Sequence, residues 1–275
     1  MSPHHYNSLC LDLTHPVGDA TVSWPTASKF RVTQAVAKDS GSGYWYEARD
    51  FSQAEHSGTH TDAPAHFYRD RWHTADIPLN RLAAPAIKVD ISQRAETDPD
   101  TELLVSDLED WEAEHGVIPD HSIAVVHTGR GKLYTDRDRY LGRPEDVSLP
   151  EDDVEHLHFP GVSPEAAKWL VKERKVVGVA IDTPSTDRGQ SRTFSTHQVL
   201  GEANVWGLEN LANSDQLPAK GFMIYNMVHK LEGGSGGPTR VVAVLNKDHV
   251  GNGGKVKGGS IPFTFIFFML LLIYY

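Results

Sequence analysis

The sequence predicts an α/β fold with a mixed sheet. Short apolar runs, which are typical of buried strands, outnumber the amphipathic segments that are typical of helices, and the two kinds are interspersed along the chain. The 275 residues include 39% apolar and 23% charged residues, the composition of an ordinary globular protein with a sizeable core. We expect residues 1–250 to form a single domain, followed by a glycine-rich tether and an apolar tail over residues 251–275.

The first half of the chain contains four predicted strands and one predicted helix. Leu9–Leu13 is a short opening strand, and the aromatic, alternating segment Gly43–Glu55 is a strand that leads into a cluster of histidines. Ile87–Ile91 and Ile123–His127 are apolar runs bounded by turn residues, which indicates buried strands. Val105–His115 has apolar residues on one side and acidic residues on the other, as in an amphipathic helix.

The second half continues the same alternation. Ser163-Pro164-Glu165 predicts a helix start, with a capping hydroxyl, a proline at the first helical position and an acid in the first turn. The strand Val176–Ile181 follows directly. Phe222–Met227 and Val241–Leu245 are two further strands, joined by a turn at Gly233–Gly237.

Other segments are predicted to lie outside this framework. Asp136–Glu155 is polar and irregular, as in a surface loop, and Gly251–Gly259 is a flexible tether. As a helix, the apolar tail Ile261–Tyr275 would span about 22 Å, short of the ~30 Å hydrocarbon core of a bilayer, so a membrane location is not expected. A strand, a short tail anchor and a gene-model artefact remain open. We expect a chain without residues 258–275 to stay soluble, folded and active, and loss of its circular dichroism spectrum would show that the tail belongs to the core.

Charge and cysteine content exclude several classes of protein. Lys and Arg number 26 against 37 Asp and Glu, a net charge of −11 that argues against nucleic acid or an anionic membrane as the main partner. The single cysteine, Cys10, excludes an intrachain disulfide and a thiolate zinc site. Because residues 1–14 lack the apolar stretch of a secretory signal, we expect a cytoplasmic location.

The chemistry is expected in the histidine cluster. A helix would place residue 62 roughly 200° from residue 60, whereas a strand places His56, His60 and Asp62 on one face. Gly58 would lie on that face and leave room for a metal ion. Three N/O ligands with an open position are typical of a catalytic metal site.

His66 is the expected proton shuttle beside these ligands. Pro64 forces a bend that could return His66 to the same face. A metal there would lower the pKa of water to near ~7, and His66, free of the metal, would move the proton. The alternative is that these histidines cluster by chance at the surface or in the core. The placement of glycine and proline favours the metal site.

Residues farther along the chain are ambiguous from spacing alone. The polar run Asp182–Asp187 precedes His197 and Glu209. Taken alone, Glu209 is a solvated carboxylate and His197 a satisfied helix histidine.

Several segments together resemble one family. The motif His-Ser-Gly-Thr-His-Thr-Asp-Ala-Pro-Ala-His-Phe is similar to the signature of the cyclase family of metal-dependent hydrolases, which includes bacterial kynurenine formamidases and isatin hydrolases. The resemblance extends over residues 9–246 and is carried by residues 56–67, 12–15, 24–25, 159–163, 178–185 and 233–244.

The resemblance implies a function for particular residues. His56, His60 and Asp62 match the ligands of a first metal ion, while Asp62, His197 and Glu209 match those of a second. His66 matches the catalytic acid/base, and Trp24 matches a residue that lines the substrate pocket. The resemblance also implies a compact β/β/α fold and a homodimer or homotetramer.

Aromatic residues near the motif suit a flat aromatic amide as substrate, although filling the core is the alternative for most of them. They are Trp24, Phe67, Tyr44, Trp45 and Tyr46.

The expected reaction is hydrolysis of an amide on an aniline nitrogen, with one or two divalent ions, zinc or manganese. Hydrolysis of N-formyl-L-kynurenine to kynurenine and formate, a step of tryptophan catabolism, is the first candidate and isatin ring opening the second. Glu209 resembles the formamidase set, whereas residues 55–60 and 210–218 look closer to the isatin hydrolases. A scaffold that binds a metal or a small molecule without turnover is the alternative from another class.

Overall fold

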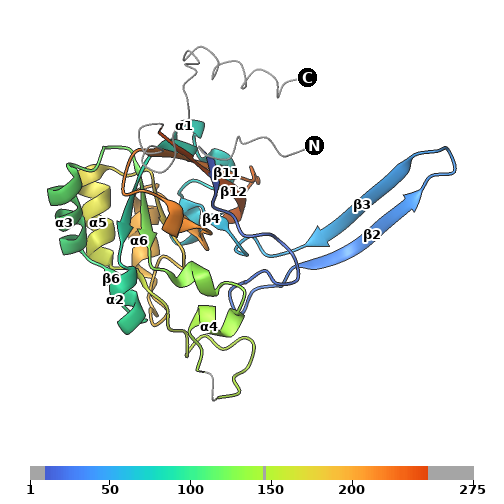
Figure 1. The fold of residues 1–275 in the computed structure, drawn as a ribbon, viewed down its shortest axis with the longest axis horizontal. Helices are drawn as coiled ribbons and strands as arrows, with labels where there is room; N and C mark the ends of the chain where they lie inside the picture. The colour runs from blue at the N-terminus through green and yellow to red at the C-terminus, as the bar shows by residue number, and fades with distance from the viewer. Residues whose placement is uncertain (1–9, 145–146, 247–275) are drawn as a thin grey trace, which may run out of the picture.

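The computed structural model describes residues 10–144 and 147–246, and its centre is one mixed sheet (Figure 1). Within these residues the strand order is β1-β12-β11-β5-β7-β9-β10-β4, and β4 also pairs with β12. Seven strands therefore close on themselves, with β1 attached at β12. The strands of this sheet are β1 (Cys10–Asp12), β4 (His60–Asp62), β5 (Ala83–Asp90), β7 (Ile123–His127), β9 (Gly178–Ile181), β10 (Trp206–Glu209), β11 (Phe222–Val228) and β12 (Gly236–Leu245). The predicted α/β class with a mixed sheet is confirmed.

The apolar runs are continuous because the parallel strands β5, β7, β9 and β10 are covered on both faces. On β7, Ile123 and Val125 pack into the cluster enclosed by the sheet, which includes Trp206. Ala124 and Val126 pack into a second cluster, against the helices. Each large apolar side chain buried this way stabilises the fold by about 1.5–3 kcal/mol.

Helices cover the outer face of the sheet, where α3 (Val105–His115) and α5 (Pro164–Arg174) lie side by side (Figure 1). Both agree with the predicted segments. The hydroxyl of Ser163 accepts a hydrogen bond from the backbone N–H of Ala166 at 3.1 Å, which caps α5 as expected. The remaining helices are α1 (Leu79–Leu82), α2 (Ser92–Thr97), α4 (Arg137–Leu141), α6 (Ser195–Glu202) and the 3-10 turns η1 (Pro64–His66), η2 (Thr74–Asp76), η3 (Arg130–Leu133) and η4 (Ser214–Gln216).

The prediction of an irregular loop over Asp136–Glu155 was wrong at α4. The side chain of Asp136 caps this helix, and Gly142 ends it in a left-handed conformation at φ 70°. Tyr140 and Leu141 are fully buried in a third apolar cluster. Local capping and two buried side chains are enough to form a helix in an otherwise polar segment.

The predicted strand Gly43–Glu55 corresponds to β3 (Trp45–Ser52), which pairs with an unpredicted strand, β2 (Arg31–Asp39). This hairpin forms an arm that projects from the body of the molecule (Figure 1). A further two-stranded sheet joins β6 (Glu102–Leu103) and β8 (Gly161–Val162).

The turn predicted at Gly233–Gly237 is shorter than expected, because Gly236 and Gly237 already belong to β12 and pair with β4. Leu9 and the segments Gly251–Gly259 and Ile261–Tyr275 lie outside the described residues. No helix among the described residues is long and apolar enough to cross a membrane.

Candidate metal centre

The candidate site lies where β4 closes the sheet. His60 and Asp62 are two residues apart on this short, fully buried strand, so their side chains share a face. The register places Glu209 of β10 directly opposite His60. His197 projects from α6 towards the same point. The closure thus brings His197 and Glu209 next to His60 and Asp62, which lie more than 130 residues earlier in the sequence.

The prediction that residues 56–62 form one extended strand was wrong in its first half. The strand begins at His60, and Gly58 has φ +63°, a left-handed conformation that disfavours other residues. A Cβ on Gly58 would lie 3.0 Å from Cγ2 of Thr21, which is not one of the candidate ligands. Gly236 leaves the space at the site instead, because a Cβ there would overlap the ring of His56.

The carboxylates of Asp62 and Glu209 and the three predicted histidine ligands converge. Oδ1 of Asp62 lies 2.6 Å from Nδ1 of His56 and 3.2 Å from Nε2 of His60, and its Oδ2 lies 3.0 Å from Nε2 of His197. Oε1 of Glu209 lies 3.1 Å from Nε2 of His197, and Oε2 lies 3.4 Å from Nε2 of His60. Asp62 therefore contacts all three histidines, and Glu209 contacts two of them.

His60 provides a test of whether a cation fits. Its Nδ1 lies 2.8 Å from the carbonyl oxygen of Gly58, which assigns the ring proton to Nδ1 and leaves a lone pair on Nε2. That Nε2 is buried, makes no hydrogen bond to any described residue, and faces the oxygens of Asp62 and Glu209. A lone pair opposite two carboxylates needs a positive charge between them, and imidazole with carboxylate is a donor set that zinc and manganese accept.

The electrostatics of His60 indicate the same need. Burial alone would lower the pKa of His60, but the carboxylates of Asp62 and Glu209 beside its Nε2 outweigh burial and raise the pKa to about 10. Without a metal ion, the site therefore takes up a proton. Among the described residues, two groups have ligand atoms within 4.8 Å of one another, His60 with Asp62 and Glu209, and His56 with Asp62 and His66.

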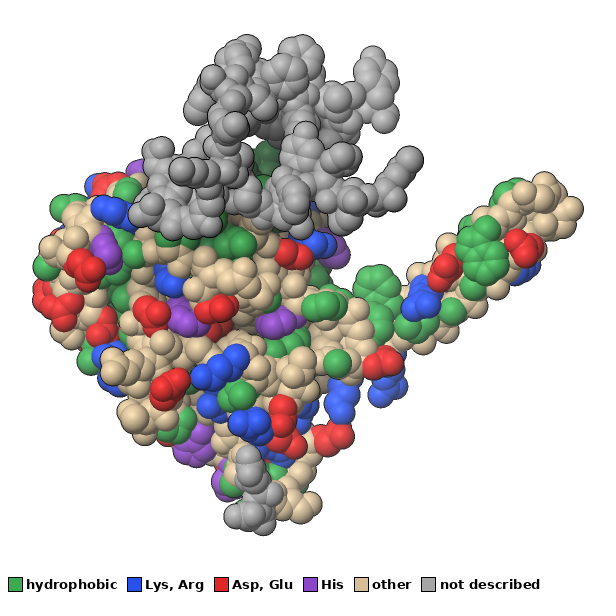
Figure 2. Space-filling view, viewed as in Figure 1, with side chains coloured by type: hydrophobic (Ala, Val, Ile, Leu, Met, Phe, Trp, Pro, Cys, Tyr) green, Lys and Arg blue, Asp and Glu red, His purple; other side chains and the backbone are tan. Residues whose placement is uncertain are grey.

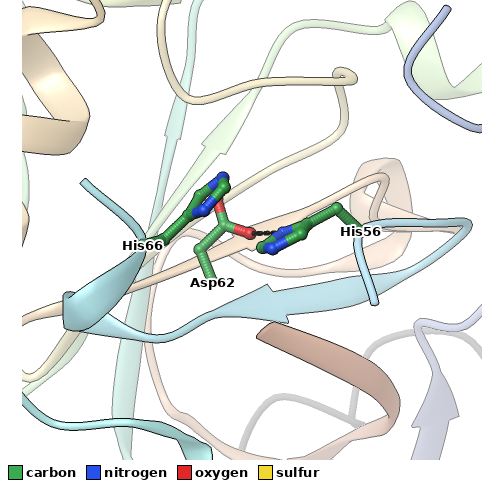
Figure 3. Close-up of side chains that lie close together, drawn as sticks. All are labelled: His56, Asp62 and His66. Atoms are coloured by element: carbon green, nitrogen blue, oxygen red, sulfur yellow. Dashed lines mark hydrogen bonds and ion pairs between the residues drawn. The ribbon is translucent and has the colours of Figure 1, made fainter. Parts of the chain in front are cut away.

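His66 returns to the site as the bend at Pro64 predicted. Its ring stacks on that of His56 with centroids 3.8 Å apart, and Figure 3 shows both approaching the carboxylate of Asp62. Burial lowers the pKa of His66 to about 4, against the opposing charge of Asp62, so the ring is neutral at pH 7. In the part of the chain that the structure describes, no hydrogen bond holds its ring nitrogens.

Asp187 supports the site, although sequence reasoning gave it no function. Its Oδ2 lies 2.6 Å from Nδ1 of His197, which directs Nε2 of that ring towards Asp62 and Glu209. It also accepts hydrogen bonds from the backbone N–H groups of Thr196 and His197 at the start of α6. The sequence signal available for Asp187 was its position: it is a carboxylate shortly before a helix that carries a candidate ligand.

Glu55 and Ser235 hold His56 from the other side and were also missed. The hydroxyl of Ser235 lies 3.0 Å from Nε2 of His56 and donates to Oε2 of Glu55 at 2.8 Å. Glu55 also accepts the backbone N–H of Ser235 at 2.9 Å. The glycine-rich segment before β12 is thereby fixed next to the ring of His56.

Asp182 belongs to a separate buried cluster and does not line the site cavity. It accepts hydrogen bonds from the backbone N–H groups of Thr128 and Gly129 at 2.8 and 3.0 Å, and from the hydroxyl of Ser214 at 3.2 Å. Burial alone would raise the pKa of Asp182, but hydrogen bonds from His127 and Thr128 lower it below its usual value. This cluster ties the end of β9 to the end of β7.

A cavity of about 240 Å³ opens onto the candidate ligands. Trp24 and Phe67 line it, as predicted, and Phe194 adds a third aromatic wall that the sequence did not indicate.

Figure 2 shows the side chains on one face of the molecule, coloured by type. The expectation that Tyr44, Trp45 and Tyr46 lie near the site or fill the core was wrong. They belong to the arm and are 61%, 57% and 49% exposed.

The closed mixed sheet carries a cluster of histidines and carboxylates that could hold a metal ion, an arrangement in agreement with a metal-dependent hydrolase. The chain belongs to the cyclase family, whose family model, Cyclase, matches residues 11–188.

The relatives include an isatin hydrolase and a kynurenine formamidase. The chain is 36% identical over 202 residues to an isatin hydrolase from Roseibium aggregatum, covering 70% of this chain and 73% of the relative. It is 24% identical to a kynurenine formamidase from Salinibacter ruber, covering 84% and 95%. The solved structure of isatin hydrolase A from Ralstonia solanacearum superposes with a TM-score of 0.77 at 33% identity, covering 86% of this chain and 92% of that one.

Proposed function

We propose that the protein opens a cyclic amide fused to an aromatic ring, with isatin as the model substrate. The observation that carries this proposal is the lining of the cavity. Three aromatic rings form its walls, and among the described residues no Lys or Arg lines it. A flat, uncharged substrate suits such walls, because apolar surfaces fix the ring and a few polar groups fix the reacting bond.

N-formyl-L-kynurenine is the second candidate, which reverses the order that the sequence favoured. Its amino-acid carboxylate would enter a cavity that holds the carboxylates of Asp62 and Glu209 and, among the described residues, has no Lys or Arg to pair with it. Glu209 favours this reaction, because it completes the formamidase-like ligand set. The higher identity to an isatin hydrolase, 36% against 24%, supports the cyclic amide.

His56, His60, Asp62, His197 and Glu209 would hold one or two divalent ions, zinc or manganese. When bound, such an ion polarises a carbonyl group and lowers the pKa of a water molecule. Trp24, Phe67 and Phe194 hold the aromatic ring and exclude bulk water. As the water oxygen adds to the carbonyl carbon, a ring nitrogen of His66 accepts a proton, and it then gives that proton to the amide nitrogen as the C–N bond breaks.

The test combines metal content with turnover. The purified protein is dialysed against a chelator, reloaded separately with zinc or manganese, and assayed with isatin and with N-formyl-L-kynurenine. Isatin turnover that chelation abolishes and metal restores is the expected result. Turnover of N-formyl-L-kynurenine alone would reverse the choice of substrate. Metal binding without turnover of either would favour the non-catalytic scaffold.

A further inference from the structure

Phe194 has a backbone conformation that a bulky residue disfavours. Its φ is 49° and its ψ is 44°, in the left-handed region, where the Cβ of a residue other than glycine crowds the following carbonyl oxygen. Phe194 directly precedes α6, the helix that carries His197, and its side chain lines the site cavity. Such a conformation persists only where surrounding contacts hold it, and residues of this kind cluster at ligand-binding sites. The contacts that hold Phe194 therefore bear on how the cavity binds a substrate.

The ring of Phe194 joins the two other aromatic walls of the cavity. Its centroid lies 5.0 Å from that of Phe67 and 6.2 Å from that of Trp24. It also lies 6.0 Å from the ring of His197, at an angle of 78°. Among the ring pairs of the described residues, Phe194 is the one aromatic side chain that contacts both Trp24 and Phe67. The walls therefore form one continuous surface only while the ring of Phe194 keeps its place.

The hydroxyl of Ser191 holds the backbone of Phe194. Its Oγ accepts a hydrogen bond from the backbone N–H of Phe194 at 3.1 Å, and it donates its own proton to Oδ1 of Asp187 at 3.1 Å. Asp187 is buried, and its oxygens also accept the backbone N–H groups of Thr196 and His197. The hydroxyl of Ser191 thus ties Phe194 to a carboxylate that is itself fixed at the start of α6.

The first part of the same loop is anchored to a neighbouring segment. The backbone N–H of Gly189 donates to the carbonyl oxygen of Phe159 at 2.9 Å, and a Cβ on Gly189 would lie 2.5 Å from the carbonyl oxygen of Leu157. Nε2 of Gln190 donates to that same carbonyl oxygen at 2.7 Å. Since these contacts end at residue 190, the described side chain that bonds the backbone N–H of Phe194 is Ser191.

We propose that Ser191 is a positioning residue that keeps the ring of Phe194 in the cavity wall and so sets the affinity of the cavity for a flat aromatic amide. Asp187 fixes both this loop and His197, so the substrate wall and a candidate metal ligand share one anchor. The inference deepens the proposed function and rests on it for the class of substrate.

The experiment compares Ser191→Ala with wild type in isatin hydrolysis, together with the metal content of both proteins. The KM should rise about three- to tenfold, the factor that corresponds to the loss of one hydrogen bond. The kcat and the metal content should stay within about twofold of wild type, because Asp187 keeps its bonds to Thr196 and His197. Ser191→Thr retains the hydroxyl and should restore the KM. Thr193→Val is the matched control, since the hydroxyl of Thr193 lies in the same loop but bonds Ser195 instead of Phe194.

A double-mutant cycle shows whether Ser191 acts through Phe194. Phe194→Ala should raise the KM at least as much as Ser191→Ala does. Ser191→Ala should then add no further rise in the Phe194→Ala background, because the ring that Ser191 positions is gone. Crystal structures give a readout that does not depend on activity: Phe194 should be left-handed in wild type and should leave that conformation in Ser191→Ala.

The outcomes separate the proposal from a general structural effect. A higher KM in Ser191→Ala that Ser191→Thr restores, and that disappears in the Phe194→Ala background, supports it. An unchanged KM, a loss of metal together with kcat, or a left-handed Phe194 in the crystal structure of Ser191→Ala would overturn it. A wild-type protein that does not hydrolyse isatin contradicts the proposed function instead, and the two crystal structures then decide the assignment of Ser191.

Discussion

Replacement of His66 by alanine separates a proton shuttle from a metal ligand. The structure permits both, since His66 stacks on His56 at 3.8 Å and its ligand atom lies within 4.8 Å of those of His56 and Asp62. As a shuttle, its loss should lower kcat/KM by about 10²–10⁴-fold, the usual contribution of general acid/base catalysis. That range corresponds to about 2.7–5.4 kcal/mol of transition-state stabilisation.

The metal content of His66→Ala should then equal that of wild type, because the ligand set His56, His60, Asp62, His197 and Glu209 is intact. Elemental analysis after dialysis measures the metal, and isatin hydrolysis measures kcat/KM. His73→Ala is the matched control, since His73 lies in the same segment but has a side chain that is 43% exposed and pairs with Asp76 outside the cavity. Metal loss in His66→Ala together with the loss of turnover would refute the assignment and make His66 a ligand.

The remaining predictions concern the ligands, the fold and the space that the site requires. Asp62→Ala should lose bound metal and with it any rise in Tm on adding zinc or manganese, because Asp62 contacts all three candidate histidine ligands. Asp182→Asn should lower the free energy of unfolding by about 2–4 kcal/mol at pH 7, because the substitution places an amide NH₂ group against buried backbone N–H groups that need an acceptor. Because the folded-state pKa of Asp182 is lowered, its contribution to stability is fully present at pH values above the unfolded-state pKa near 3.8 and is lost as the pH falls through the folded-state pKa. The urea midpoint of Asp182→Asn should therefore converge with that of wild type in strong acid. Gly236→Ala should displace the ring of His56 and weaken metal binding about 10–100-fold in a chelator competition, whereas Gly41→Ala, where a Cβ meets nothing within 4 Å, should not.

Elements whose signals are local could be predicted from the sequence. The helix at Val105–His115 follows from its amphipathic pattern, and that at Pro164–Arg174 from its capping serine and proline. The strand Ile123–His127 follows from a short apolar run bounded by turn residues, and all five of its residues are buried. The arm strand Arg31–Asp39 could not be found in this way, because it is exposed on both faces and so has no alternation of apolar and polar residues.

The site residues also divide into those that the local sequence indicates and those that it does not. His56, His60, Asp62 and His66 lie within eleven residues, so their types and spacing were sufficient to indicate a metal site. Glu209 joins them only through its register opposite His60, which depends on how β10 and β4 pair. Spacing along the chain does not encode that register, and only the resemblance to a family indicated Glu209 and His197.

Closure of the sheet and assembly of the site are one structural event. β4 has only three residues, yet it pairs with β10 on one side and β12 on the other. The first pairing sets Glu209 against His60, and the second brings Gly236 to Asp62, where its missing side chain admits the ring of His56. Two carboxylates and three histidines buried this closely carry a large electrostatic cost unless a cation lies among them. A metal ion bound there would therefore stabilise the closed sheet itself, because without it only protons taken up by the histidines compensate the carboxylates of the closing strands.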